Sequence, residues 1–241
     1  MSRLVTKVRP DRVDFPFTAL PRISTEVRSA LEREAFRAND RYLHEFLEKY
    51  AFCPYSREAR RKGEVHRYLH YCDQLDARPL VELMHQIAGD PRQVVAQVIL
   101  PCIQVTAPDF ARFVHQLTDF AHAEMGTRDV LAVAPLHPAL SFNEATPEAL
   151  IPLFRRTPDP TIQWVRLDAL ESIYEGREND TVFVEAGAID AYLAKNPKKT
   201  PLYETIAKTN AAMTKRLSVD VVVALLKDIA DDAHGSYAAL L

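Results

Sequence analysis

A histidine and two arginines in the middle of the chain have the residue types and the spacing of a site that binds an anion. The apolar segment 130–136 ends at His137-Pro138, and Arg156 and Arg166 follow it. A histidine at the end of a buried strand can transfer a proton, and converging guanidinium groups can hold a carboxylate or phosphate through paired hydrogen bonds. Pro138 also restricts His137 to an extended backbone. The pattern therefore predicts that His137, Arg156 and Arg166 converge on one pocket.

Cys53 is the candidate nucleophile or redox thiol, because the proline after it suits the first position of a helix. A thiol at a helix N-terminus feels the positive end of the helix dipole, and Arg57 in the same segment adds positive charge. We therefore expect the pKa of Cys53 to be depressed. The alternative interpretation is structural: between Phe52 and Tyr55, Cys53 could be a small apolar residue packed between two helices.

The histidine and the arginines also have structural alternatives. A loop carbonyl could satisfy His137, and the arginines could pair with Glu148, Asp168 or solvent. Arg155 is a third residue that could bind the anion, and it too could instead pair with an acidic side chain or with solvent. Both interpretations stay open from the sequence.

His66, His70 and Cys72 lie close together and could bind a metal ion. The sequence offers no fourth ligand near them, and the alternation of polar and apolar residues is typical of a half-exposed strand. The three cysteines of the chain form no CxxC pair, which excludes a zinc ribbon and a thioredoxin motif. We therefore predict no metal site.

A predicted sheet must position these residues. Strands over 94–100 and 130–136 flank an amphipathic helix over 107–125, and such a βαβ unit has parallel strands. Cys102 and His137 should then lie at the same end of the sheet. The other predicted helices span about 24–50, 53–62, 79–87, 164–174, 187–195, 201–216 and 218–232, and the other strands 65–71 and 181–185.

The predicted fold class is α+β or α/β in a single domain, with more helix than strand. A small sheet contains the βαβ unit, and the C-terminus is rich in helix. The 241 residues divide into an irregular, proline-containing arm (1–23), a core domain (24–216) and a C-terminal helical extension (217–241). Arg166 is expected about one turn into the helix that starts at Trp164.

Composition excludes several classes of protein. A net charge of −3 and a pI of about 6.2 argue against nucleic-acid binding through bulk electrostatics. The six glycines form neither GxGxxG nor GxxxxGK[ST], which counts against dinucleotide and P-loop sites. No segment has the length of a membrane span or the apolar core of a secretory signal. We expect a cytoplasmic protein without nucleic-acid or membrane partners; an oligomer is compatible with the sequence.

Three short motifs occur in the order of a known family. They are Phe52-Cys53-Pro54-Tyr55, Leu136-His137-Pro138 with Phe142, and Arg156-Thr157-Pro158-Asp159-Pro160 with Arg166. Together they resemble the bacterial domain of unknown function 1415 family over roughly residues 30 to 215. The resemblance implies a shared site, but it supplies no reaction, because the family name records no activity.

The chain departs from that family pattern at two positions. Asp159 stands where a tyrosine is usual, and Gln163 stands where a histidine is usual. Thr157 replaces a serine conservatively. If the family histidine transfers a proton or binds a metal, the resemblance implies that this chain has altered chemistry.

These observations predict an enzyme that acts on a small anionic metabolite, with Cys53 and His137 as catalytic residues. Two other classes stay open: a protein that binds haem, a metal or another cofactor through His137 or Cys53, and a pathway scaffold with a vestigial site. The sequence names neither the substrate nor a cofactor. The predicted substrate-binding residues are Arg156, Thr157, Gln163 and Arg166.

Overall fold

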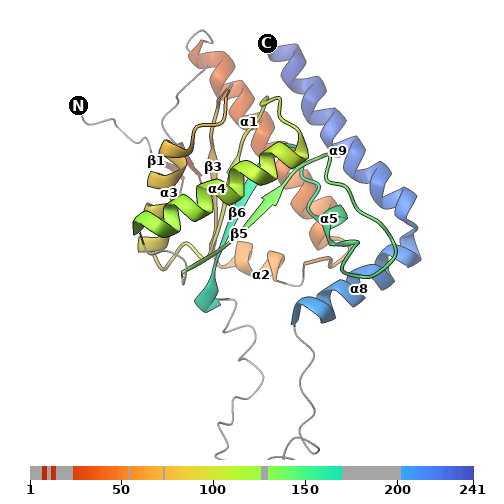
Figure 1. The fold of residues 1–241 in the computed structure, drawn as a ribbon. Helices are drawn as coiled ribbons and strands as arrows, with labels where there is room; N and C mark the ends of the chain where they lie inside the picture. The colour runs from red at the N-terminus through yellow and green to blue at the C-terminus, as the bar shows by residue number, and fades with distance from the viewer. Residues whose placement is uncertain are drawn as a thin grey trace, which may run out of the picture.

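The computed structural model of the chain describes residues 7–9, 12–14, 24–53, 55–72, 74–125, 130–169 and 202–241. These residues form a single α+β domain with one mixed sheet and helices on both of its faces (Figure 1). The strand order is β1-β2-β3-β4-β6-β5. The predicted fold class is confirmed. The strands are β1 (Lys7–Arg9), β2 (Arg12–Asp14), β3 (Val65–Leu69), β4 (Val95–Ile99), β5 (Leu131–Leu136) and β6 (Thr161–Arg166).

The edge strands β1 and β2 lie in the segment that was predicted to be an irregular arm. β2 pairs in parallel with β3, and β1 pairs antiparallel with β2. The prediction is therefore wrong for these two short strands, which add an edge to the sheet. In the sequence, Pro10 lies between the two strands and Pro16 follows them, so neither proline falls within a strand.

The predicted βαβ unit is present, with one strand inserted into it. Helix α4 (Ala107–Met125) connects β4 to β5, and these two strands run in the same direction because each is antiparallel to β6 between them. The helix predicted from Trp164 is wrong over its first residues, which belong to β6. Alternating burial, with Ile162 and Trp164 fully buried, is the pattern of a strand. The rest of that predicted helix from residue 170 lies outside the described residues, as do the predicted elements at 181–185 and 187–195.

One face of the sheet packs on α4 and on α3 (Ala77–Gly89) (Figure 1). The side chain of Asp76 caps the first turn of α3. Trp164 of β6 is the largest fully buried side chain in this core, among leucine, isoleucine and valine side chains of both helices. This apolar packing fixes which side chains of each strand point to the opposite face.

The opposite face packs on a long helix and on the C-terminal helix that runs beside it (Figure 1). The long helix is α1 (Thr25–Arg41), capped by Ser24 and continued by the π-helical turn η1 (Tyr42–Glu48). The C-terminal hairpin is α8 (Leu202–Leu217) and α9 (Val219–Leu240), so α9 extends past the predicted end at residue 232. Two short helices complete the described fold: α2 (Ser56–Arg61) and α5 (Ile151–Phe154).

In the part of the chain that the structure describes, no helix combines the length and the apolar character needed to cross a membrane.

Candidate functional site

His137 lies just after β5, as predicted, and both of its ring nitrogens are bonded to the backbone. The amide of Ala139 donates to Nδ1 at 3.0 Å, so the proton resides on Nε2, which donates to the carbonyl of Val105 at 3.1 Å. Burial lowers the pKa of His137, which favours this neutral form. The arrangement is that of a structural histidine, and a substrate would have to displace a backbone bond to reach it.

Arg156 holds the loop that follows His137. Its Nε donates to the carbonyl of Leu140 at 2.8 Å, and its guanidinium carbon lies 4.8 Å from the ring centroid of Phe142. The pKa of Arg156 is lowered by burial. The neighbouring Arg155 makes no side-chain hydrogen bond or ion pair within the described part of the chain. Of these two predicted anion ligands, Arg156 is thus occupied and Arg155 is exposed.

Arg166 lies at the other end of the sheet from His137. The β5–β6 register pairs Arg166 with Leu131, whereas Leu136, next to His137, pairs with Thr161. Six residues of strand correspond to about 20 Å. Arg166 binds the carboxylate of Asp168 at 3.1 Å, which is its structural alternative. The predicted convergence of His137, Arg156 and Arg166 is therefore wrong, because β6 is a strand that runs away from the site.

Cys102 and His137 do lie at the same end of the sheet. Each follows the carboxyl end of one of the two codirectional strands, β4 and β5. The prediction drawn from the βαβ unit is confirmed, although β6 separates the two strands.

Cys53 lies three residues before its helix. α2 begins at Ser56, with Tyr55 as its N-cap residue. Burial raises the pKa of the Cys53 thiol and outweighs the amides of Tyr55 and Ser56, which lower it, while the charge of Glu48 raises it further. The predicted depression of this pKa is wrong. The ring of the adjacent Phe52 packs 4.8 Å from that of Phe154, in keeping with the structural interpretation.

Thr157 shapes the turn before β6. Its hydroxyl donates to the carbonyl of Asp159 at 2.7 Å, and the hydroxyl of Thr161 donates to the same oxygen at 2.9 Å. The carboxyl group of Asp159 accepts a hydrogen bond from Tyr237 of α9 at 2.7 Å, and burial raises its pKa to about 7. Thr157 therefore stabilises the backbone of the turn, and Asp159 binds α9 to the sheet domain through Tyr237.

Gln163, another predicted substrate-binding residue, is bonded to a polar side chain of the neighbouring strand. The amide nitrogen of Gln97 donates to Gln163 Oε1 at 3.0 Å. The strand register pairs Gln97 with Gln163 on β6 and with Arg67 on β3. Residues paired across neighbouring strands point to the same face. Arg67, Gln97 and Gln163 therefore form a polar row across the sheet face that α1 covers.

Arg67 joins this row to α1. Its Nη1 donates to Asn39 Oδ1 at 3.0 Å and to Asp40 Oδ1 at 2.6 Å, and its guanidinium lies 5.1 Å from the ring centroid of Phe36. Only 8% of Arg67 is exposed. We refer to the five residues of this cluster as the Arg67 site: Asn39, Asp40, Arg67, Gln97 and Gln163.

The Arg67 site contains polar atoms that lack a protein partner. Asn39 and Gln97 are 1% and 3% exposed, and Asn39 Nδ2 and Gln97 Oε1 are buried without a hydrogen bond. Within the described residues, Nε and Nη2 of Arg67 also form no hydrogen bond. Gln163 and Ala134, which is paired with it on β5, are half-buried. The row thus runs from the buried face beneath α1 toward solvent.

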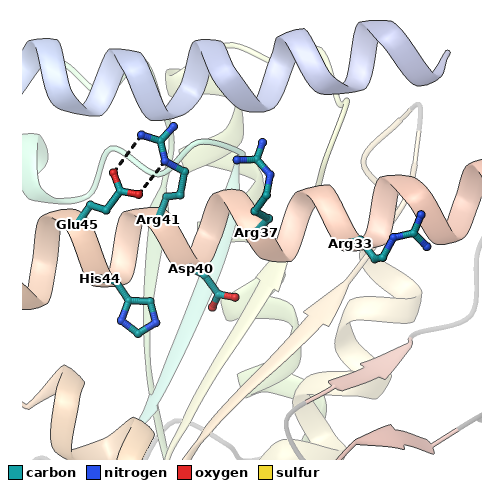
Figure 2. Close-up of a pocket in the computed structure, with 6 residues that line it drawn as sticks. All are labelled: Arg33, Arg37, Asp40, Arg41, His44 and Glu45. Carbon is teal, nitrogen blue, oxygen red and sulfur yellow. Dashed lines mark hydrogen bonds and ion pairs between the residues drawn. The ribbon is translucent and has the colours of Figure 1, made fainter.

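A pocket of about 300 Å³ lies on the outer side of α1 (Figure 2). Figure 2 shows Arg37 and Arg41 pointing toward α9, and Asp40 and His44 pointing away from it. The two arginines are occupied by carboxylates: Arg37 binds Asp232 at 2.6 Å, and Arg41 binds three acidic side chains. This pocket is therefore part of the ion-pair network between α1 and α9. Its lining residues are Arg33, Arg37, Asp40, Arg41, His44 and Glu45.

No group of three or more histidine, cysteine, aspartate or glutamate side chains could hold a metal ion in the part of the chain that the structure describes. His66, His70 and Cys72 belong to that part. Burial lowers the pKa of His70, whose two ring nitrogens have no hydrogen-bond partner there.

A family model described as "Protein of unknown function (DUF1415)" matches residues 34–187. The chain belongs to this family. All five residues of the Arg67 site fall within the match, whereas α8 and α9 lie beyond it. Comparisons with curated proteins and with solved structures gave no match. Membership in the DUF1415 family thus supports the predicted resemblance and assigns no activity.

Arg67, Gln97 and Asn39 were missed by the sequence interpretation. The available signal was a polar residue within a predicted buried segment, such as Gln97 between Ala96 and Val98. An isolated glutamine in one strand indicates little by itself. The strand pairing makes this glutamine informative, because it places Arg67, Gln97 and Gln163 side by side on one face of the sheet.

Proposed function

We propose that this member of the DUF1415 family binds a small anionic metabolite at the Arg67 site. The observation that carries the proposal is the pair of buried atoms without a hydrogen-bond partner, Asn39 Nδ2 and Gln97 Oε1, beside the guanidinium of Arg67, of which only Nη1 bonds to described residues. Buried polar atoms without a partner are unfavourable, and native proteins seldom retain them unless water or a ligand binds there. Nε and Nη2 of an arginine form a fork that matches the two oxygens of a carboxylate.

The neighbouring amides suggest the rest of the ligand. Asn39 Nδ2 offers one more donor to the anion, and Gln97 Oε1 offers an acceptor to a hydroxyl or amine of the ligand. Asp40 balances the charge of Arg67, so recognition would depend on hydrogen-bond geometry more than on net charge. A short hydroxycarboxylic acid carries both kinds of group.

This proposal keeps the predicted small anionic ligand and moves it away from Arg156 and Arg166. Turnover by Cys53 and His137 has weaker support, because the ring of His137 is bonded to the backbone and the pKa of Cys53 is raised. We propose binding as the primary function. Cys53 and Cys102 form no disulfide with the described residues, which favours the cytoplasm as the compartment in which the protein acts.

Calorimetric titration of the full chain with glycolate, lactate, acetate and phosphate tests the proposal. We expect a hydroxycarboxylate to bind more tightly than acetate, and Gln97→Met to weaken it about tenfold, which corresponds to about 1.4 kcal/mol. Gln116→Met, on the exposed side of α4 and far from the Arg67 site, is the matched control.

The thermal midpoint of the same variants separates ligand binding from a structural role. Gln97→Met removes a buried acceptor that lacks a partner but also removes the hydrogen bond from Gln97 Nε2 to Gln163. These two effects have opposite signs, so the stability of the unliganded protein should change by no more than about 1 kcal/mol. Equal affinity of Gln97→Met and wild type, or no binding of any of the four anions, would refute the proposal.

A further inference from the structure

A second pocket, of about 500 Å³, lies where the corner between α8 and α9 meets the segment 144–150. Its volume is in the range of small-molecule sites. One wall belongs to the region that the family model matches, and the other belongs to the helices beyond it. None of the residues of the Arg67 site lines it, so a ligand here would be distinct from the one proposed above.

Thr214 lines this pocket and carries a buried hydroxyl group without a partner. The residue is 1% exposed, and its Oγ1 makes no hydrogen bond. A helical threonine commonly satisfies its hydroxyl by bonding to the carbonyl one turn back, and Thr214 does not. Because Thr214 lines the pocket, a ligand that packs against it could give this hydroxyl group the hydrogen-bond partner it lacks.

The same pocket contains the N-terminus of a 22-residue helix, α9. Ser218 caps this helix from a left-handed backbone conformation (φ 68°), and its side chain accepts from the amide of Val221. The amides of Val219 and Asp220 have no acceptor among the described residues. Free amides at the N-terminus of a long helix bind anions, particularly carboxylates and phosphates.

The charged residues of the pocket have both signs. Lys215 is a cation near the α9 N-terminus, and Glu144 and Asp220 are anions. None of the three forms an ion pair in the described portion of the chain. Leu150 and Pro147 add apolar surface to the lining. The pocket therefore combines groups that suit a carboxylate, an ammonium and an apolar chain.

We propose that this pocket binds a free α-amino acid with an apolar side chain. The carboxylate of the ligand bonds to the first amides of α9, the hydroxyl of Thr214 and the ammonium of Lys215. The α-ammonium group pairs with Glu144, and the side chain contacts Leu150. A simple anion would be repelled by Glu144 and Asp220, and a simple cation by Lys215 and the helix N-terminus.

Calorimetric titration of the full chain with L-leucine tests this proposal against two partial ligands. 4-Methylpentanoate lacks the ammonium group, and 3-methylbutylamine lacks the carboxylate. We expect leucine to bind at least about tenfold more tightly than either. Thr214→Val, which preserves shape, and Glu144→Gln should each weaken leucine binding about tenfold.

Lys208→Gln is the matched control, because Lys208 lies on the same helix but pairs with Glu204. It should bind leucine like the wild type, as should Gln97→Met, which alters only the Arg67 site. No binding of leucine up to about 10 mM would overturn the proposal. Equal binding of all three compounds would also overturn it, as would full affinity in both Thr214→Val and Glu144→Gln.

Discussion

Asp159 is a buried carboxyl group whose side-chain partner among the described residues is the hydroxyl of Tyr237. No cation lies beside it there to stabilise a negative charge, and the titratable groups that interact with it are Cys102 and Tyr237. Burial therefore favours the protonated acid and raises the pKa to about 7. A single residue thus couples the attachment of α9 to pH.

Asp159→Asn should remove this dependence on pH. The pKa of Asp159 is higher in the folded protein than in the unfolded chain. The contribution of its protonated carboxyl group to the free energy of unfolding is therefore complete below about pH 4 and is lost as the pH rises through about 7. The asparagine variant should be more stable than the wild type at pH 8, by on the order of 2 kcal/mol or more. Urea unfolding of both proteins from pH 5 to pH 8 measures it. The difference between the two curves isolates Asp159, since the buried histidines contribute to both. A constant difference across this range would contradict the assignment.

Helix α1 uses its polar residues on two sides. Arg37 and Arg41 bind carboxylates of α9. Asp40, which points away from α9 in Figure 2, binds Arg67 of the sheet. The amphipathic pattern of a helix predicts that such residues avoid the core, but it does not identify their partners. α9 supplies Asp232, which contacts both arginines of α1. Charge complementarity therefore contributes to the register between these two helices.

Arg41→Met should destabilise the fold more than Arg33→Met does. Arg41 is half-buried and binds Asp228, Asp232 and Glu45, whereas Arg33 has no ion pair among the described residues. We expect a loss of about 1 kcal/mol for Arg41→Met, and a change within about 0.5 kcal/mol for Arg33→Met. Denaturant unfolding at low and high salt measures both. An equal effect of the two substitutions would show that the network contributes no stability.

The whole molecule is a sheet domain to which a C-terminal helical hairpin adds part of the core. The family model covers the sheet from β3 to β6 and ends before α8. Ala233 and Tyr237 of α9 are nevertheless buried against α1 and the sheet, and Asn210 of α8 donates to the carbonyl of Phe52 at 2.9 Å. The hairpin is therefore integral to this chain, although it lies outside the family match.

Truncation after Leu217 should abolish cooperative unfolding. Removal of α9 exposes Leu31 and Phe36 of α1 and leaves the buried carboxyl group of Asp159 without Tyr237. The expected product aggregates or shows no thermal transition in circular dichroism. Deletion of Leu241 alone, a residue that is 67% exposed, is the control and should unfold like the wild type. A truncated chain with an unchanged midpoint would show that α9 is dispensable for the fold.

Sequence patterns predicted the elements with a clear hydrophobic period. Helix α4 spans the predicted residues, and β4 and β5 lie within one residue of each predicted strand boundary. The failure at β6 has a physical reason: a short segment with few breaking residues fits both a helix and a strand until its neighbours are known. β6 forms where it does because β4 and β5 leave a gap between them that an antiparallel strand fills.

The sequence by itself determined a single domain of α+β or α/β class, the codirectional strands around α4, and the positions of His137 and Cys102 at one end of the sheet. Only the tertiary structure decided which polar residues meet. Local patterns report the period of one element, whereas proximity depends on strand order and register. Insertion of β6 in the antiparallel direction separates Arg166 from His137 and places Gln163 beside Gln97, with Arg67 on the next strand. The candidate site therefore follows from strand pairing, which no local pattern encodes.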